Sequence, residues 1–233
     1  MKKYVALFDW DDTVQKYSVM DRWVKLLVSE GLMDEKIHEV YKPIVADYKE
    51  GLIDNNSKTE RGLTVLGEYM EGIEVSESRS LYYEFRNKND GFINRLIIDK
   101  LFPFLKENGV DIIVISGSPE DVLKLYQKEF NIDEIYAMKY DVLDGKYLST
   151  FPINTGIGSG KQKFIDDIVA KDKEILFAFG DSVSDIPLLK SAKYSFVNSN
   201  KNFLDKENIY YLDFWKEEDI LFIVEKIKEA INS

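Results

Sequence analysis

Three short, almost continuously apolar segments constrain the fold of this chain more than any other feature. They span residues 4–8, 110–115 and 175–179, and each ends in acidic or small residues. Uninterrupted apolar runs of this length are typical of strands that are covered on both faces, as in parallel sheets. Helical periodicity directly follows two of the runs, which gives the order strand, loop, helix, strand. The sequence therefore predicts an α/β fold with a Rossmann-like, doubly wound and mostly parallel sheet.

The region after the first run has a different pattern. From about residue 19 to about residue 84 there is no strand signal, but four groups of apolar residues recur at helical spacing, punctuated by Gly31, Gly51 and Gly72. Glycine is the preferred residue just beyond a helix C-terminus. A second interruption, at residues 142–151, contains Asp144-Gly145, which is a hairpin turn signal. We therefore expect a core domain of residues 1–14 and 89–233, interrupted by a smaller α-helical bundle, the cap, at residues 15–88.

Composition excludes several classes of protein. The 31 Lys and Arg residues against 42 Asp and Glu give a net charge of −11, which disfavours nucleic acids and anionic membrane surfaces as partners. The absence of cysteine excludes disulfides, thiolate metal sites and cysteine nucleophiles. No apolar run approaches the ~18 residues of a membrane-spanning helix, and the first run is too short for a secretory signal. We expect a cytoplasmic protein; the sequence predicts no oligomeric state.

Polar residues follow each of the three predicted strands. The first strand is followed by Asp9, Asp11 and Thr13, the second by Ser116 and Gly117, and the third by Asp181 and Asp185. Ligands of parallel α/β sheets bind at this carboxyl edge. Four carboxylates at one edge repel one another unless a cation lies among them, and oxygen ligands without His or Cys favour Mg²⁺. Helix N-capping would explain any one of these Asp residues, but it explains the whole set poorly.

Four segments in chain order resemble the motifs of the haloacid dehalogenase superfamily. Residues 8–14, Phe-Asp-Trp-Asp-Asp-Thr-Val, resemble its first motif, Asp-x-Asp-x-Thr, and the strand ending in Ser116 resembles the second. Lys161 stands where the third motif places a lysine at the start of a helix. Residues 180–185 match the fourth motif, Gly-Asp-x-x-x-Asp. The long helical insertion after the first motif is similar to that of the phosphoserine phosphatase subfamily.

This resemblance implies a reaction and the residues that perform it. Asp9 would attack a phosphoryl group and form a phospho-aspartate. Asp11 would be the general acid and base, and its backbone carbonyl would join the Asp9 and Asp181 carboxylates in binding Mg²⁺. The implied activity is Mg²⁺-dependent hydrolysis of a phosphomonoester of a small metabolite.

The remaining motif residues would hold the phosphate and support the site. The resemblance implies that the Ser116 hydroxyl, the Gly117 N–H and the Lys161 ammonium bind the phosphate oxygens. Asp185 would orient Lys161 or a metal-bound water, and Thr13 would support the first motif without touching the substrate.

Other activities stay open at this point. A phosphomutase uses the same nucleophile but withholds water from the intermediate, and a dehalogenase needs no acid at position 11. A receiver-like phospho-acceptor module also gathers Asp, Ser or Thr and Lys, but it is about half as long and lacks the helical insertion. Residues 155–162 superficially resemble a nucleotide-binding P-loop, yet Thr155 and Gln162 stand where Gly and Ser or Thr are required.

Substrate choice depends on the cap, where the resemblance weakens. Ser18 stands where phosphoserine phosphatases place a Glu for the substrate ammonium. Gly62 stands at the position of their carboxylate-binding Arg, with Arg61 one residue early, and one residue rotates a helical side chain by about 100°. Asp12 adds an acidic group near the cap. We take Ser18, Asp12 and Arg61 as candidate specificity residues, with a solvated helix charge as the alternative for Arg61, and expect a substrate other than phosphoserine.

Overall fold

The computed structural model describes residues 3–232, and its main feature is a six-stranded parallel sheet. The strand order is β3-β2-β1-β6-β7-β8, so the chain runs outward from β1 on one side and then on the other. The bounds are β1 Lys3–Phe8, β2 Asp111–Pro119, β3 Glu134–Met138, β6 Lys173–Gly180, β7 Tyr194–Asn198 and β8 Ile209–Leu212. The three predicted runs form the central strands β2, β1 and β6. The doubly wound Rossmann-like fold is confirmed, with its switch point between β1 and β6.

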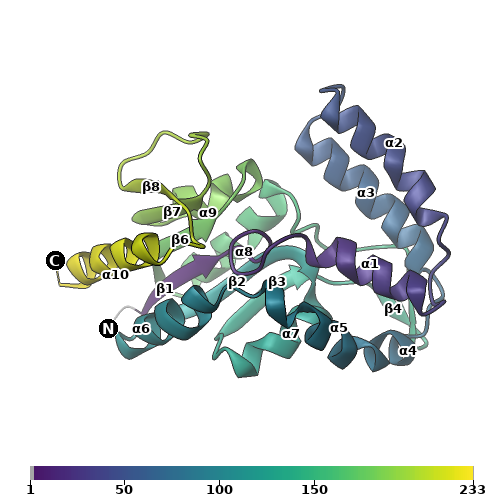
Figure 1. The fold of residues 1–233 in the computed structure, drawn as a ribbon, viewed down its shortest axis with the longest axis horizontal. Helices are drawn as coiled ribbons and strands as arrows, with labels where there is room; N and C mark the ends of the chain where they lie inside the picture. The colour runs from purple at the N-terminus through teal and green to yellow at the C-terminus, as the bar shows by residue number, and fades with distance from the viewer. Residues whose placement is uncertain (1–2, 233) are drawn as a thin grey trace.

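Helices cover both faces of the sheet (Figure 1). Alternate residues of β1 point to opposite faces: Ala6 and Phe8 pack on one side, Val5 and Leu7 on the other. The first side is covered by η2 Ile97–Leu101 (a π-helical turn), α6 Phe102–Glu107, α7 Glu120–Glu129 and α10 Glu217–Ile231, and the second by α8 Gly158–Ala170 and α9 Ile186–Ser191. None of the helices within residues 3–232 is both long and apolar enough to cross a bilayer.

Helices alone make up the named elements between β1 and α6. They are α1 Val19–Ser29, α2 Ile37–Lys49, α3 Asn55–Met70, α4 Val75–Ser80, α5 Tyr82–Asn89, the 3₁₀ turn η1 Asp90–Phe92 and the π-helical turn η2 given above. Gly31, Gly51 and Gly72 follow α1, α2 and α3 with φ of 72°, 73° and 84°, as expected of C-terminal glycines. Figure 1 shows α2 and α3 side by side, projecting from the rest of the molecule. The division into a core and a cap at residues 15–88 stays a prediction.

The predicted hairpin is present, but it lies against the cap. Its strands are β4 Val142–Leu143 and β5 Lys146–Tyr147. Asp144 and Gly145 both have positive φ, 48° and 80°, as a tight hairpin turn requires. The Gly72 N–H donates to the Tyr147 carbonyl at 2.9 Å, and the Val75 N–H donates to the Gly145 carbonyl at 2.8 Å. The second interruption is therefore attached by backbone hydrogen bonds to the segment between α3 and α4.

Candidate active site

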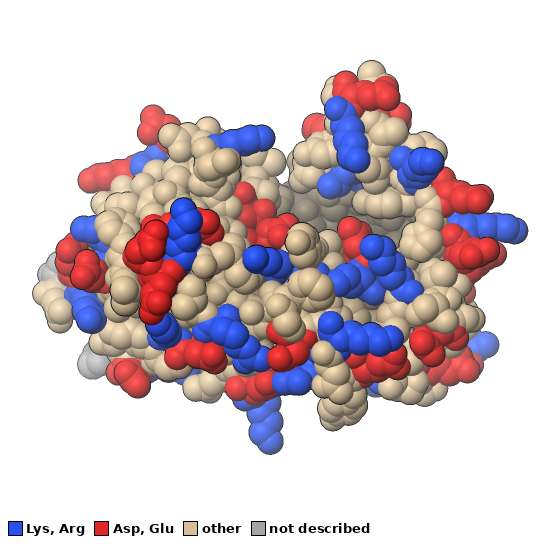
Figure 2. All heavy atoms as spheres, viewed as in Figure 1, with Lys and Arg blue, Asp and Glu red and all other residues tan. Residues whose placement is uncertain are grey.

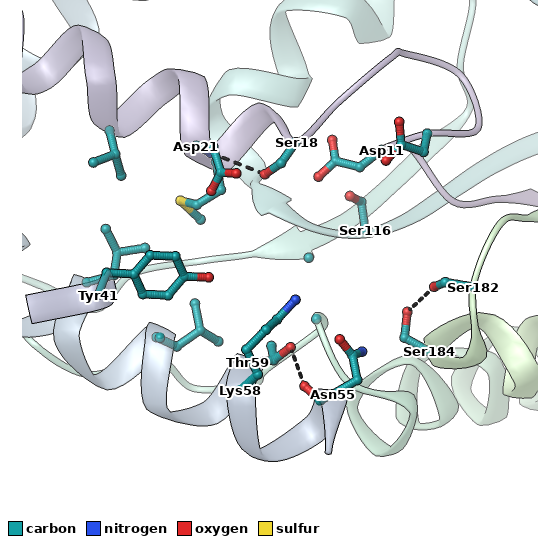
Figure 3. Close-up of a pocket in the computed structure, with 18 of the residues that line it drawn as sticks. Asp11, Ser18, Asp21, Tyr41, Asn55, Lys58, Thr59, Ser116, Ser182 and Ser184 are labelled. Carbon is teal, nitrogen blue, oxygen red and sulfur yellow. Dashed lines mark hydrogen bonds between the residues drawn. The ribbon is translucent and has the colours of Figure 1, made fainter. Parts of the chain in front are cut away.

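A cavity of about 570 Å³ lies where the carboxyl ends of β1, β2 and β6 face helices α1, α2 and α3. Figure 2 shows the molecule hollowed between the core and the projecting α2–α3 pair, and Figure 3 shows the side chains inside the cavity. This volume is in the range of sites for small molecules. Of the candidate catalytic and phosphate-binding residues, Asp9, Asp11, Ser116, Gly117 and Lys161 all line the cavity.

A buried lysine forms the centre of the polar network. Lys161, in the first turn of α8, is only 2% exposed, and its Nζ donates to Asp9 Oδ1 at 2.7 Å and to Asp185 Oδ1 at 2.5 Å. Burial lowers the pKa of Lys161, but the carboxylates of Asp185 and Asp9 more than offset this, and the net shift is upward. The other oxygen of Asp185 accepts from the N–H groups of Asp181 and Ser182 at 3.0 and 3.1 Å. Lys161 therefore stays a fixed cation beside Asp9.

Glycines allow these elements to approach closely. A Cβ on Gly180 would lie 2.6 Å from Asp185 Cβ, so the residue before Asp181 must be glycine for Asp185 to fold back under it. A Cβ on Gly117 would lie 2.7 Å from Gly156 Cα, which shows how tightly the loop after β2 packs against the loop before α8. The motif glycines thus position the carboxylate and the loops around Lys161.

Asp9, Asp181 and Asp185 offer carboxylate oxygens that all lie within 4.8 Å of one another. Burial, partly offset by Lys161, raises the pKa of Asp9 to about 7. Burial and then the charges of Asp185 and Asp9 raise the pKa of Asp181 to about 9. These two carboxylates resist ionisation because they are buried and repel one another, and a bound divalent cation would offset that repulsion. A set of oxygen donors fits Mg²⁺. The predicted ligand set of Asp9, Asp11 and Asp181 stays a prediction.

The Asp11 carboxylate is held between helix α1 and strand β2. Its Oδ1 accepts from the N–H of Val19, the first residue of α1, at 3.0 Å, and its Oδ2 accepts from Ser118 Oγ at 2.8 Å. Burial raises the pKa of Asp11 to about 6, although both hydrogen bonds favour the ionised form. A carboxyl group that titrates near neutrality is suited to proton transfer. No role for Ser118 is predicted from the sequence, although Ser118 lies two residues after Ser116 on the same strand and therefore on the same face.

Ser116 is oriented as a donor. Its side chain is fully buried, and its Oγ accepts from the Ser118 N–H at 3.1 Å, which leaves the hydroxyl proton free for a ligand. Thr13 is also fully buried, but it does not line the cavity, and its Oγ1 has no hydrogen-bond partner in the described part of the chain. One end of the cavity thus offers a ligand two donors, the Ser116 hydroxyl and the Lys161 ammonium.

The three candidate specificity residues lie in different surroundings. Ser18 lines the cavity, and its Oγ caps α1 by accepting from the Asp21 N–H at 3.2 Å. Asp12 also lines the cavity, in a left-handed conformation with φ of 53°. Arg61 is not among the lining residues; it is more than half exposed and pairs with Asp47 at 3.5 Å. The structure therefore brings Ser18 and Asp12 to the cavity, but not Arg61.

Several cap residues of the cavity have no sequence signal. Tyr41 on α2, Lys58 on α3 and Asp21 on α1 all line it. Figure 3 shows Lys58 across the cavity from Asp11, Tyr41 at one end, and Asp21 beside Ser18. The Lys58 Nζ lies 4.8 Å from the centre of the Tyr48 ring and has no ion-pair partner within residues 3–232. These residues belong to no motif, and only the packing of the cap helices brings them together.

Comparisons with known proteins agree with this geometry. A probable phosphatase of Mycobacterium tuberculosis is 24% identical over 209 residues, which cover 87% of this chain and 71% of that protein. The histidinol-phosphatase of Neisseria meningitidis is 23% identical over 196 residues, which cover 81% and 86%. A solved substrate-bound phosphoserine phosphatase superposes with a TM-score of 0.62 at 18% identity, covering 97% of this chain and 98% of that one.

The family assignment rests on the match to a family model. The model of the haloacid dehalogenase-like hydrolases matches residues 6–190, a stretch that contains all four motifs and the helical insertion. The superposition on the solved phosphoserine phosphatase covers 97% of this chain, so it includes the sheet and the helices between β1 and β2. The chain therefore belongs to the haloacid dehalogenase-like hydrolase family and has a phosphoserine phosphatase-like fold.

Proposed function

We propose that this enzyme is a phosphatase that hydrolyses phosphomonoesters of small metabolites through a phospho-aspartate on Asp9, with Mg²⁺ as cofactor. One observation carries the proposal: Asp9 is paired with a buried lysine at the floor of a cavity that also presents the Ser116 hydroxyl. A carboxylate and a phosphate dianion repel each other, so the reaction requires fixed positive charge at this point. Lys161 supplies that charge, held in place by Asp185.

The residues of the site can perform both halves of the reaction. In the first half, Asp9 forms a bond to phosphorus while the bond from phosphorus to the alcohol oxygen breaks, and Asp11 gives its proton to that oxygen. In the second half, Asp11 takes a proton from water, the water oxygen attacks phosphorus, and the Asp9 carboxylate is released with inorganic phosphate. Ser116 and Lys161 donate to the phosphate oxygens throughout.

The metal site would consist of the carboxylates around Asp9. Asp9 and Asp181 would hold Mg²⁺ together with the Asp11 carbonyl, and Asp185 would support them from its contact with Lys161. When bound, Mg²⁺ neutralises charge on the phosphate and on the carboxylates.

The relatives suggest which substrates to test first. Two of the similar proteins act on histidinol phosphate and phosphoserine, as their names state. Phosphoserine is the less favoured of the two here, because Ser18 and Gly62 stand where its recognition requires Glu and Arg. Both compounds belong in a panel of phosphorylated metabolites, which would rank the substrates directly.

The test is phosphate release from p-nitrophenyl phosphate with Mg²⁺ and with EDTA. We expect turnover only with Mg²⁺, none above background for Asp9→Asn, and a loss of about 10²- to 10⁴-fold for Asp11→Asn. Asp47→Asn is a matched control, because Asp47 is exposed and lies outside the cavity. Turnover in EDTA, or normal turnover by Asp9→Asn, would contradict the proposal. Phosphoryl transfer to a second substrate without phosphate release would indicate a mutase instead.

A further inference from the structure

Gly62 lies in the middle of α3, where glycine disfavours a helix, and the structure shows a reason for it. A Cβ at this position would lie 2.8 Å from Cε2 of Tyr41 and 3.6 Å from its Cζ and hydroxyl. The edge of the Tyr41 ring therefore lies directly on the backbone of α3. An aromatic ring from α2 thus occupies the space beside Gly62, and both residues line the cavity.

The Tyr41 side chain faces the cavity. Figure 3 shows its hydroxyl directed toward the middle of the cavity, in the direction of Ser116. The hydroxyl makes no hydrogen bond to any other residue within 3–232, while burial and the charge of Asp21 raise the pKa of Tyr41. The ring is thus fixed against Gly62 on one side and is available to a ligand on the other, with a neutral hydroxyl at its tip.

The cavity wall that contains Tyr41 includes several apolar side chains. Side chains from three helices line the cavity beside it: Met20 and Val24 from α1, Ile37 from α2, and Leu63 from α3. An aromatic ring and branched aliphatic side chains bind apolar or planar groups by burial and stacking.

Two candidate residues of the cap, Ser18 and Arg61, do not form a site for the ammonium and carboxylate groups of an amino acid. Ser18 carries no charge, and its Oγ accepts from the Asp21 N–H, while Arg61 pairs with Asp47 outside the cavity. The charged side chains that α1, α2 and α3 contribute to the cavity are Asp21 and Lys25 from α1 and Lys58 from α3. The Tyr41 ring and the aliphatic side chains therefore form an apolar surface of this wall beside the charged groups.

We propose that Tyr41, seated on Gly62, is a specificity-determining residue that stacks on the alcohol part of the substrate, and that this part carries an apolar, ring-sized group. The inference rests on the proposed phosphatase function, because it names the class of substrate for that site. It makes this cavity selective for ring-bearing phosphomonoesters of alcohols over short, highly charged ones.

The test compares phosphates of primary alcohols that differ mainly in the proposed group. We expect kcat/KM for 2-phenylethyl phosphate to exceed that for ethyl phosphate by about 10- to 100-fold, the effect of burying a phenyl-sized group. Phosphoserine is the charged comparison. The same preference should appear in calorimetric binding of 2-phenylethylphosphonate and ethylphosphonate, which cannot be hydrolysed and which report on the cavity without turnover.

Variants separate stacking from general effects on the fold. Tyr41→Ala should reduce the preference by about 2- to 10-fold, the contribution of an aromatic contact, whereas Tyr41→Phe should retain it. Gly62→Ala should reduce it as well, because the new Cβ displaces the ring, and alanine is the better helix former, so the helix is retained. Tyr83→Ala is the control: Tyr83 is a cap tyrosine that is 76% exposed and outside the cavity, and its loss should change nothing.

Three results would overturn the inference: equal binding of the two phosphonates, an unchanged preference in Tyr41→Ala, or a higher kcat/KM for phosphoserine than for 2-phenylethyl phosphate. The last result would show that the charged side chains of the cavity, and not its apolar surface, determine the choice. Failure to hydrolyse any ester, p-nitrophenyl phosphate included, would instead count against the proposed function. The phosphonate measurement would still decide the inference in that case.

Discussion

Replacing Lys161 with methionine tests the electrostatic design of the site. Methionine keeps most of the volume and removes the cation that Asp9 and Asp185 share, at 2.7 and 2.5 Å. Removal of one partner from a buried ion pair costs about 3–5 kcal/mol, because a charge is left buried without compensation. For a chain of this size that is a fall in melting temperature of about 6–20 °C.

The loss should depend on pH with a definite sign. The folded-state pKa of Asp9 is about 7, above its ordinary value of 3.8, and Lys161 acts to lower it. A carboxyl group with a raised folded-state pKa contributes stability at low pH that is lost as pH rises. Without Lys161 this pKa rises further, so the destabilisation by Lys161→Met should be small near pH 5 and largest near pH 8.

Urea denaturation of both proteins at several pH values measures this difference in the free energy of unfolding. Lys171→Met is a suitable control, since Lys171 is an exposed lysine whose ion pair with Glu134 is on the surface. A Lys161→Met protein within about 1 kcal/mol of wild type near pH 8, or a loss that does not change with pH, would refute the reasoning.

Two further predictions concern the metal and the backbone of the site. Burial and neighbouring carboxylates raise the pKa of Asp181 to about 9, above its ordinary value of 3.8, so its contribution to stability is lost as pH rises between these values. Asp181→Asn should therefore raise the stability of the metal-free protein near pH 8 by about 1–3 kcal/mol. It should also remove the stabilisation that Mg²⁺ gives the wild type. An undiminished Mg²⁺ effect in a thermal melt would contradict the assignment of Asp181 as a metal ligand. Gly160→Ala should lower stability and activity together, because its Cβ would lie 1.7 Å from the Asn154 carbonyl oxygen, whereas Gly91→Ala, with nothing within 4 Å, should be neutral in the same melt and assay.

The central part of the fold could be predicted because burial determines it. Strands β1, β2 and β6 are covered on both faces, so their residues are apolar almost without interruption. The outer strands were not predicted: β8 is a half-buried edge strand of four residues, and β3 has an exposed face with Glu134. Short strands with partly exposed faces resemble loops in composition, so their place in the sheet depends on tertiary pairing.

The candidate site likewise has one part that the sequence predicts and one part that it does not. The catalytic and phosphate-binding candidates lie at the ends of the central strands or at the start of α8, so chain order alone brings them together. The cap side of the cavity depends on the phase of each helix and on how the helices pack. Arg61 and Gly62 are neighbours in sequence, yet Arg61 lies outside the cavity and Gly62 lines it beside Tyr41. The attachment of the hairpin to the α3–α4 segment likewise had no sequence signal.

The central claim is that Asp9 carries the phosphoryl group during turnover. Acid quenching of the wild-type enzyme with substrate and Mg²⁺, followed by mass spectrometry of the fragment that contains Asp9, tests it most directly. We expect a mass increase of one phosphoryl group on Asp9. It should be enriched in Asp11→Asn, because loss of the general base slows hydrolysis of the intermediate, and absent from Asp9→Asn. A phosphoryl group on another residue, or steady turnover by Asp9→Asn, would contradict it.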